Sequence, residues 1–159
     1  MRSDLSGRRE TIVFCANSAP ARSSRWFSDS GTSIIVEAGE VWASAGFIIL
    51  QGCRNPHGSV ELKRIVLQPK GRGYGRACVR LLAEMAFRDL GAHRFWLDVK
   101  ERNERALALY RDEGFVEEGR LRESVRSDAG YESLIVMSML RAEHESSDTA
   151  RRLLDTATS

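Results

Sequence analysis

The feature that most restricts the fold is a turn dense in glycine and basic residues, which joins an expected strand to an expected helix. The strand is Val60–Leu67, a run of mostly aliphatic residues with Glu61 inside it. The helix is Arg76–Leu90, whose apolar residues recur at helical spacing: Cys78, Leu81, Leu82, Met85, Ala86 and Leu90. The turn between them reads Pro69-Lys70-Gly71-Arg72-Gly73-Tyr74-Gly75. The chain therefore passes from a buried strand to a helix start through a highly adaptable backbone.

The residue types of this turn suit a bound anion. The first backbone N–H groups of a helix have no partner within the helix, and the helix dipole adds partial positive charge there. Gly73 and Gly75 allow a phosphate to approach the backbone closely. Lys70, Arg72 and Arg76 add mobile positive charge. We interpret the segment as a phosphate-binding turn, and the alternative is a surface turn that only starts a helix.

Three familiar phosphate or nucleic-acid motifs do not account for the turn. A P-loop requires Gly-Lys followed by Ser or Thr, which the sequence lacks. A dinucleotide-binding fingerprint requires a glycine where Arg76 stands. Arg72–Gly75 starts like an RNA-binding ribonucleoprotein motif, but the chain continues into a helix instead of a strand with aromatic residues.

The rest of the chain alternates strand patterns with one short helix. Further strands are expected at Ile12–Phe14, Thr32–Glu37, Val41–Leu50, Arg94–Val99, Phe115–Arg126 and Tyr131–Leu140. Ala21–Asp29 is expected to form a helical turn or two. The short helix is capped by Asn103 and ended by Gly114, and Gly91 ends the preceding helix. The polar tail from Arg141 is expected to fray, apart from a helical turn near its end.

Composition restricts the class of protein. A chain of 159 residues that is 42% hydrophobic and 29% charged has the size and balance of one globular domain. A net charge of +2 is too small for a dedicated nucleic-acid binder or a polybasic membrane anchor. Three widely separated cysteines favour a reducing compartment, and no spacing of histidine and cysteine indicates a metal site. We expect a cytoplasmic protein with neither nucleic acid nor membrane as partner.

The sequence carries two motifs that resemble, in type and in order along the chain, those of the GNAT superfamily of acetyl-CoA-dependent N-acetyltransferases. The resemblance is greatest to the RimJ/RimL-like branch of that superfamily. Lys70–Gly75 is similar to the family's pyrophosphate loop, and Arg72–Ala77 offers a second register. Asn103-Glu104-Arg105-Ala106, followed by Tyr110 and Gly114-Phe115, is similar to the family's second motif. The resemblance runs from about Ile34 to Leu140. It implies a single α/β (α+β) domain over residues 1–140, with a mixed, mostly antiparallel sheet flanked by helices, and a polar tail over 141–159.

The resemblance also implies a set of site residues. Acetyl-CoA would be held through backbone groups of Ile65, Val66 and Leu67, which would bind its pantetheine arm like an added strand. Its other expected contacts are Lys70, Gly71, Arg72, Gly73, Tyr74, Gly75, Arg76, Asn103 and Ala106. Glu61 lies where some members carry a catalytic glutamate and is the expected base; the alternative is a solvent-facing strand residue. Tyr110 is the expected acid for the leaving thiolate; the alternative is a tyrosine packed in the core.

Further expectations concern other polar side chains. Asp98 is expected to be a structural carboxylate at a strand end rather than a second base. Glu123 is expected to line the acceptor mouth, and the histidines are expected to lie in loops or at the surface.

The reaction expected from this resemblance is direct transfer of acetyl to a primary amine without a covalent enzyme intermediate. The acceptor is open among a protein N-terminus, a polyamine, an amino acid and an aminoglycoside, and a homodimer is a family-level expectation. Two rivals remain at this level: a non-catalytic sensor that binds acyl-CoA on the same fold, and an RNA-binding module that uses the Arg72–Gly75 turn.

Overall fold

The structure is a computed structural model that describes residues 10–16, 19–28, 31–38, 43–67 and 74–157, with side chains over 46–67 and 74–149. Its described strands form one eight-stranded sheet in the order β1-β2-β3-β4-β5-β6-β8-β7. The strands are β1 (Glu10–Ala16), β2 (Ala19–Ser28), β3 (Gly31–Ala38), β4 (Ala43–Gln51), β5 (Ser59–Leu67), β6 (Arg94–Lys100), β7 (Val116–Ser127) and β8 (Gly130–Leu140). Neighbouring described strands are antiparallel except β5 and β6, which are parallel. The predicted mixed, mostly antiparallel sheet is confirmed.

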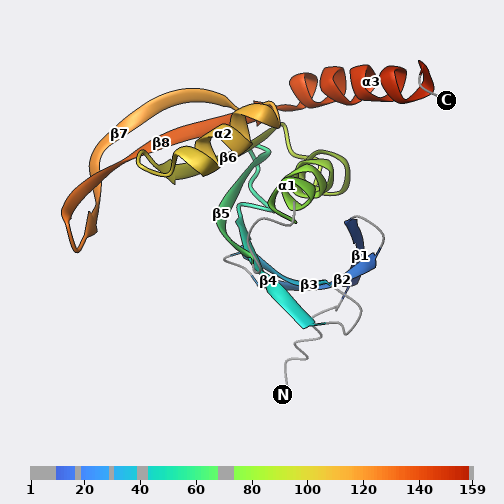
Figure 1. Ribbon diagram of the computed structural model, residues 1–159, viewed down its shortest axis with the longest axis horizontal. Coiled ribbons are helices and arrows are strands. Elements are labelled where there is room, and N and C mark those ends of the chain that lie inside the picture. The colour runs from blue at the N-terminus through green and yellow to red at the C-terminus, as the bar shows by residue number, and fades with distance from the viewer. Residues whose placement is uncertain (1–9, 17–18, 29–30, 39–42, 68–73, 158–159) are drawn as a thin grey trace.

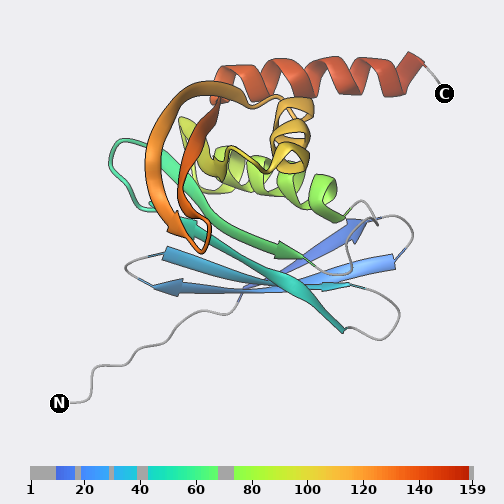
Figure 2. The same cartoon turned by 60° about the vertical axis from the view of Figure 1, so that its left-hand side comes forward.

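The helices lie against this sheet. They are α1 (Tyr74–Glu84), which continues into the wider turn η1 (Met85–Asp89), then α2 (Glu104–Asp112) and α3 (Arg141–Ala157). In Figure 2, α1 and α2 lie on the same side of β1–β4, with α3 beyond them. Figure 1 shows the long hairpin of β7 and β8 arching away from the body of the molecule. Gly91, with φ of +67°, follows η1 in the left-handed conformation expected of a glycine that ends a helix.

The core lies between the middle of the sheet and α1. Its fully buried side chains alternate along the strands and recur on one face of the helix, as both periodicities require. The largest of them are Phe95, Ile48, Leu50, Leu82, Leu97, Met137, Val60 and Val79. Within the described residues, no helix is long and apolar enough to cross a membrane.

The expected helical turn at Ala21–Asp29 is wrong. Residues 19–28 form β2, which pairs in register with β1 on one side and β3 on the other. A short alanine- and serine-containing segment has only a weak helical preference, and two flanking ladders of backbone hydrogen bonds outweigh it. Helix nucleation is also unfavourable for a segment of this length.

The expectation that the tail from Arg141 frays is also wrong, because α3 follows β8 directly. Its hydroxyl-bearing residues satisfy themselves within the helix: Ser146 donates to the carbonyl of Ala142 at 2.8 Å, and Thr149 donates to that of Glu145 at 2.9 Å. His144, expected in a loop or at the surface, lies with its ring 4.9 Å from that of Phe87, between ring centroids. The polar tail therefore forms a helix that contacts η1 through His144, which its composition alone did not indicate.

Candidate active site

A cleft opens where β5 and β6 separate. The two strands pair from Ser59–Glu61 to Arg94–Trp96, and beyond this point both continue and line a cavity of about 830 Å³. Its walls come from β5, β6, α2, the start of α1 and the β7–β8 hairpin, which contributes Val125 and Leu134. They include Leu62, Lys63, Arg64, Ile65, Leu67, Tyr74, Gly75, Arg76, Asp98, Val99, Lys100, Asn103, Arg105, Ala106, Leu109 and Tyr110. A divergence between parallel strands thus creates an open groove flanked by strand backbone.

Two local features shape the β5 side of the cleft. The register between β4 and β5 shifts, with Ile49 opposite Arg64 and Leu50 opposite Leu62, so Lys63 is an extra residue in a β-bulge. A bulge bends its strand and redirects the side chain of the extra residue. Further along, Gly46 on β4 has φ of +151°, and an added Cβ there would lie 1.9 Å from the carbonyl oxygen of Val66. Gly46 therefore permits the close approach that positions Ile65–Leu67.

Most of the predicted cofactor residues that the structure describes meet in this cleft. Its lining contains Ile65, Leu67, Tyr74, Gly75, Arg76, Asn103 and Ala106, together with the predicted acid Tyr110. The side chain of Val66 is exposed and not part of the lining, but the prediction concerned its backbone. Lys70, Gly71, Arg72 and Gly73 lie outside the described residues. Glu61 is a neighbour of the lining residues and not itself one of them.

Tyr110 reaches the cleft from α2 and is largely enclosed. Tyr110 is 6% exposed, and its ring centroid lies 5.6 Å from that of Phe115 in an edge-on contact. Burial raises the pKa of its hydroxyl to about 12. The hydroxyl therefore remains protonated throughout the neutral range and is a hydrogen-bond donor to whatever occupies this part of the cleft.

Charged groups meet at the point where β5 and β6 separate. Nζ of Lys63 lies 3.1 Å from Oε1 of Glu61, and the Glu61 side chain is 13% exposed whereas that of Lys63 is 49% exposed. Asp98, expected to be structural, lines the cleft with Lys63. The pKa of Lys63 is raised above its ordinary value by its hydrogen bond with Glu61, then by the charge of Glu61 and more weakly by that of Asp98. Glu61 is thus not the fully solvent-facing strand residue of the alternative reading.

An ion-pair cluster that sequence reasoning missed joins α1 to α2. Arg80 donates from Nε and Nη2 to the two carboxylate oxygens of Glu113, at 2.6 and 3.1 Å. Arg76 lies 2.8 Å from Asp112 and 3.3 Å from Glu113. The Glu113 side chain is only 2% exposed, so the two arginines compensate a buried charge. The signal in the sequence was the spacing of Arg76 and Arg80 on one helix face, but their partner is distant in the chain.

The start of α2 is held by its cap, as predicted. Oδ1 of Asn103 accepts from the backbone N–H of Ala106 at 3.2 Å, and Asn103 itself lines the cleft. The α1 start lies close by, because an added Cβ on Gly75 would lie 3.4 Å from Cδ2 of Leu109. Basic side chains outnumber acidic ones in the lining: Lys63, Arg64, Arg76, Lys100 and Arg105 against Asp98 and Asp112. This charge balance suits an anionic ligand.

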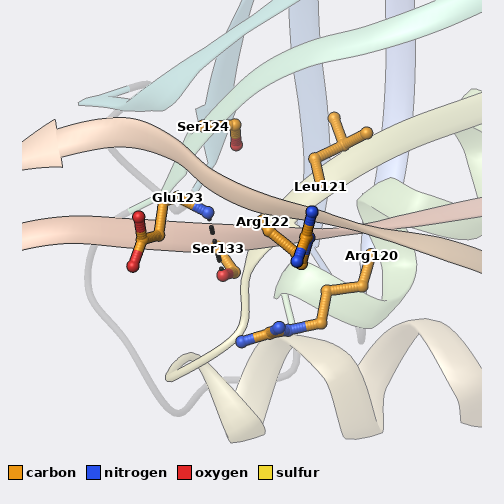
Figure 3. A pocket seen from close by; sticks show the side chains of 6 residues that line it. All are labelled: Arg120, Leu121, Arg122, Glu123, Ser124 and Ser133. Atoms are coloured by element: carbon orange, nitrogen blue, oxygen red, sulfur yellow. Dashed lines mark hydrogen bonds between the residues drawn. The ribbon is translucent and has the colours of Figure 1, made fainter.

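A second cavity lies under the arch of β7. The register between β7 and β8 shifts between Leu121 and Val125, and Glu123 has φ of +48° within this bulge. Its backbone N–H donates to Oγ of Ser133 at 3.1 Å. Figure 3 shows Glu123 and Ser133 with Arg120, Leu121, Arg122 and Ser124 around this cavity of about 730 Å³. Glu123, predicted at the acceptor mouth, lines this cavity rather than the β5–β6 cleft.

The cysteine that lies in the core is poorly suited to nucleophilic chemistry. Cys78 on α1 is buried, and burial raises the pKa of its thiol to about 11. The reactive form of cysteine is the thiolate, so this thiol is chemically quiet at neutral pH.

Comparisons with known proteins agree with this geometry. A model of the acetyltransferase (GNAT) family matches residues 6–115. Spermidine N(1)-acetyltransferase from Vibrio cholerae serotype O1 is 30% identical over 89 residues, which are 55% of this chain and 51% of that protein. The chain thus spans about half the length of this curated relative.

Two solved structures from Vibrio cholerae show the same fold. The spermidine N-acetyltransferase in complex with CoA and spermine has a TM-score of 0.68 and 27% identity, covering 73% of this chain and 69% of that one. Mutant forms of the spermidine/spermine N-acetyltransferase have a TM-score of 0.69 and 26% identity, covering 75% of this chain and 72% of that one.

Proposed function

Because the chain belongs to the acetyltransferase (GNAT) family, we propose that it transfers the acetyl group of acetyl-CoA to a primary amine of a polyamine or a similar cationic acceptor. The observation that carries this proposal is the cleft between β5 and β6, which brings Tyr110 and the strand Ile65–Leu67 together. The surplus of basic side chains around the cleft suits the acidic phosphates of acetyl-CoA. Among the acceptors left open by the sequence, polyamines are favoured because the relatives reported above are named for spermidine. A protein N-terminus, the acceptor of the RimJ/RimL-like branch, is the second choice.

The cofactor would lie along β5. Backbone groups of Ile65–Leu67 on the side that faces the cleft would bind the pantetheine arm as an added strand binds a sheet edge. The start of α1, with Tyr74, Gly75 and Arg76, would face the pyrophosphate. Arg76 is already paired with Asp112 and Glu113, so we propose two roles for it: it ties α1 to the end of α2, and it adds positive charge near the pyrophosphate. Lys70–Gly73 complete this loop in the proposal.

The reaction would proceed by direct attack in a ternary complex. The acceptor arrives as an ammonium, because a lysine-like amine has a pKa of about 10.4. Glu61 accepts its proton, the neutral nitrogen attacks the thioester carbonyl carbon, a C–N bond forms, the C–S bond breaks, and the nitrogen releases its second proton to water. The products are the N-acetylated amine and CoA, and Glu61 returns its proton to solvent.

Tyr110 would act on the departing sulfur. Full transfer of a proton from a hydroxyl of pKa near 12 to a thiolate of pKa about 8.5 is unfavourable by about 5 kcal/mol. We therefore propose that Tyr110 donates a hydrogen bond to the sulfur as negative charge develops, and that the released thiolate takes its proton from water. This is a more limited form of the acid role expected from the motif.

The proposal is tested by binding and turnover together. Acetyl-CoA at about 100 times its dissociation constant should stabilise the protein by about 2.7 kcal/mol and raise the unfolding midpoint, with NAD and ATP as controls. Spermidine should then elicit thiol release faster than an N-terminal peptide or an aminoglycoside does. Binding of acetyl-CoA without thiol release for any amine would support the non-catalytic sensor. Absence of the acetyl-CoA shift would refute the proposal, and steeply salt-dependent RNA binding would support the RNA-binding module.

A further inference from the structure

We propose that Lys63 determines acceptor specificity: its ammonium holds the Glu61 carboxylate at the edge of the cleft, and a cationic acceptor amine must replace it there. This inference rests on the proposed function, since it assigns Lys63 a part in binding the acceptor. Lys63 would then compete with the acceptor amine for the carboxylate of Glu61, the proposed base on the same strand.

The position of Lys63 on β5 explains how it reaches Glu61. Glu61 pairs with Gln51 on β4 and with Trp96 on β6, so its backbone is fixed from both sides. Lys63 is the extra residue of the bulge, and no residue of β4 lies opposite it in the register. Side chains two residues apart on a strand lie on the same face of the sheet, so Lys63 reaches Glu61 with Nζ 3.1 Å from Oε1.

The exposure of the two partners indicates which of them can leave. The Glu61 side chain is 13% exposed and the Lys63 side chain 49%, so the carboxylate is the more enclosed partner and the ammonium, which lines the cleft, is the more exposed one. A half-exposed lysine on a flexible stem exchanges its partner readily, because exposed ion pairs are weak. An incoming ammonium can therefore take the same oxygen while Lys63 turns into solvent.

The surroundings keep Lys63 charged and attract other cations. Asp98 lines the same part of the cleft, and with Glu61 it raises the pKa of Lys63 above its ordinary value. Lys63 therefore competes as a full positive charge at neutral pH. It also repels the second ammonium of a polyamine, whereas the carboxylate of Asp98 attracts it. Removal of the lysine charge would leave two carboxylates for a cationic acceptor.

The experiment compares Lys63→Met with Lys63→Arg, which retains the charge. Arg88→Met is the matched control, since Arg88 pairs with Glu84 on the α1–η1 helix away from the cleft. Lys63→Met should lower KM for spermidine about 3- to 10-fold, the weight of a weak exposed ion pair, without a matching change in KM for acetyl-CoA. Arg88→Met should keep the spermidine KM of the unmodified protein, and Lys63→Arg, which retains the positive charge, should not lower it as Lys63→Met does.

A second measurement separates this inference from the proposed function. Calorimetric titration of spermidine into the CoA-bound protein needs no turnover, and Lys63→Met should bind spermidine more tightly by a similar factor. An unchanged or raised spermidine KM, or equal or weaker spermidine binding, would overturn the role of Lys63. Tighter binding without thiol release would leave that role standing while refuting the transferase.

Discussion

Enclosure by aromatic and aliphatic neighbours determines the chemistry of Tyr110. The residue is nearly buried, and the ring of Phe115 lies edge-on to it at 5.6 Å between centroids. Burial raises the pKa of the hydroxyl, so it stays protonated and can donate a hydrogen bond to a developing thiolate. A phenylalanine at this position keeps the ring and removes only the donor.

We expect Tyr110→Phe to lower kcat about 10- to 1,000-fold while acetyl-CoA affinity is unchanged, because the hydrogen bond forms only as the thiolate leaves. Glu61→Gln should also lower kcat, but it should in addition remove the acidic limb of the pH–rate profile. Steady-state thiol release and calorimetric binding of acetyl-CoA measure both effects. Full activity of the phenylalanine variant would exclude the proposed role of Tyr110.

The β5 side of the cleft depends on the pairing of β4 with β5. Gly46 lies opposite Leu67 in the register, at the end of β5 that faces the proposed cofactor. Its positive φ is costly for any other residue, and the carbonyl of Val66 occupies the space of a Cβ. The glycine thus allows β4 to support the backbone from which pantetheine binding is proposed.

Gly46→Ala should lower the free energy of unfolding by about 2–4 kcal/mol, because the added methyl group meets backbone that must move. The matched control is Gly119→Ala on β7, where an added Cβ meets nothing within 4 Å. The control should change stability by less than about 1 kcal/mol. Urea denaturation of both variants measures the difference, and equal stability of the two would contradict this account of β4 and β5.

Two buried acids of the core link the stability of the whole molecule to alkaline pH. Burial raises the pKa of Tyr110 from 10.0 to about 12 and that of Cys78 from 9.0 to about 11. The unfolded chain therefore loses these protons at lower pH than the folded protein does. Between the two sets of values the unfolded state binds fewer protons, so stability falls as pH rises.

We expect the free energy of unfolding to decline from about pH 8 to about pH 11, with Tyr110 contributing about 1–2 kcal/mol of the loss. Tyr110→Phe should lose correspondingly less over this interval. Urea denaturation at the two pH values, with tyrosinate absorbance as a second signal, provides the measurement. A loss of stability of the same size in the phenylalanine variant would show that Tyr110 ionises freely in the folded protein.

From β5 to β8, local patterns in the sequence were enough to locate the elements. Three kinds of local signal were sufficient: the hydrophobic period, the cap at Asn103 and the helix end at Gly91. Each acts within a few residues, so it can be recognised in the sequence before the fold is known. β2 and α3 were missed because their stability comes from outside them. β2 depends on ladders with two other strands, and α3 on internal hydroxyl bonds and the contact of His144 with Phe87.

The residues of the candidate site divide in the same way. Two motifs in the sequence were enough to nominate Ile65, Leu67, Gly75, Asn103 and Tyr110, because backbone conformation and helix spacing bring such residues to one place in this fold. Only the tertiary structure decided where the cleft opens and which arginines meet Glu113. The pairing of β5 with β6 ends at Glu61, the register with β4 shifts at Lys63, and Glu113 meets Arg80 across 33 positions of the chain. Strand divergence, a one-residue register shift and a long-range ion pair depend on how separate elements meet, which local sequence does not encode.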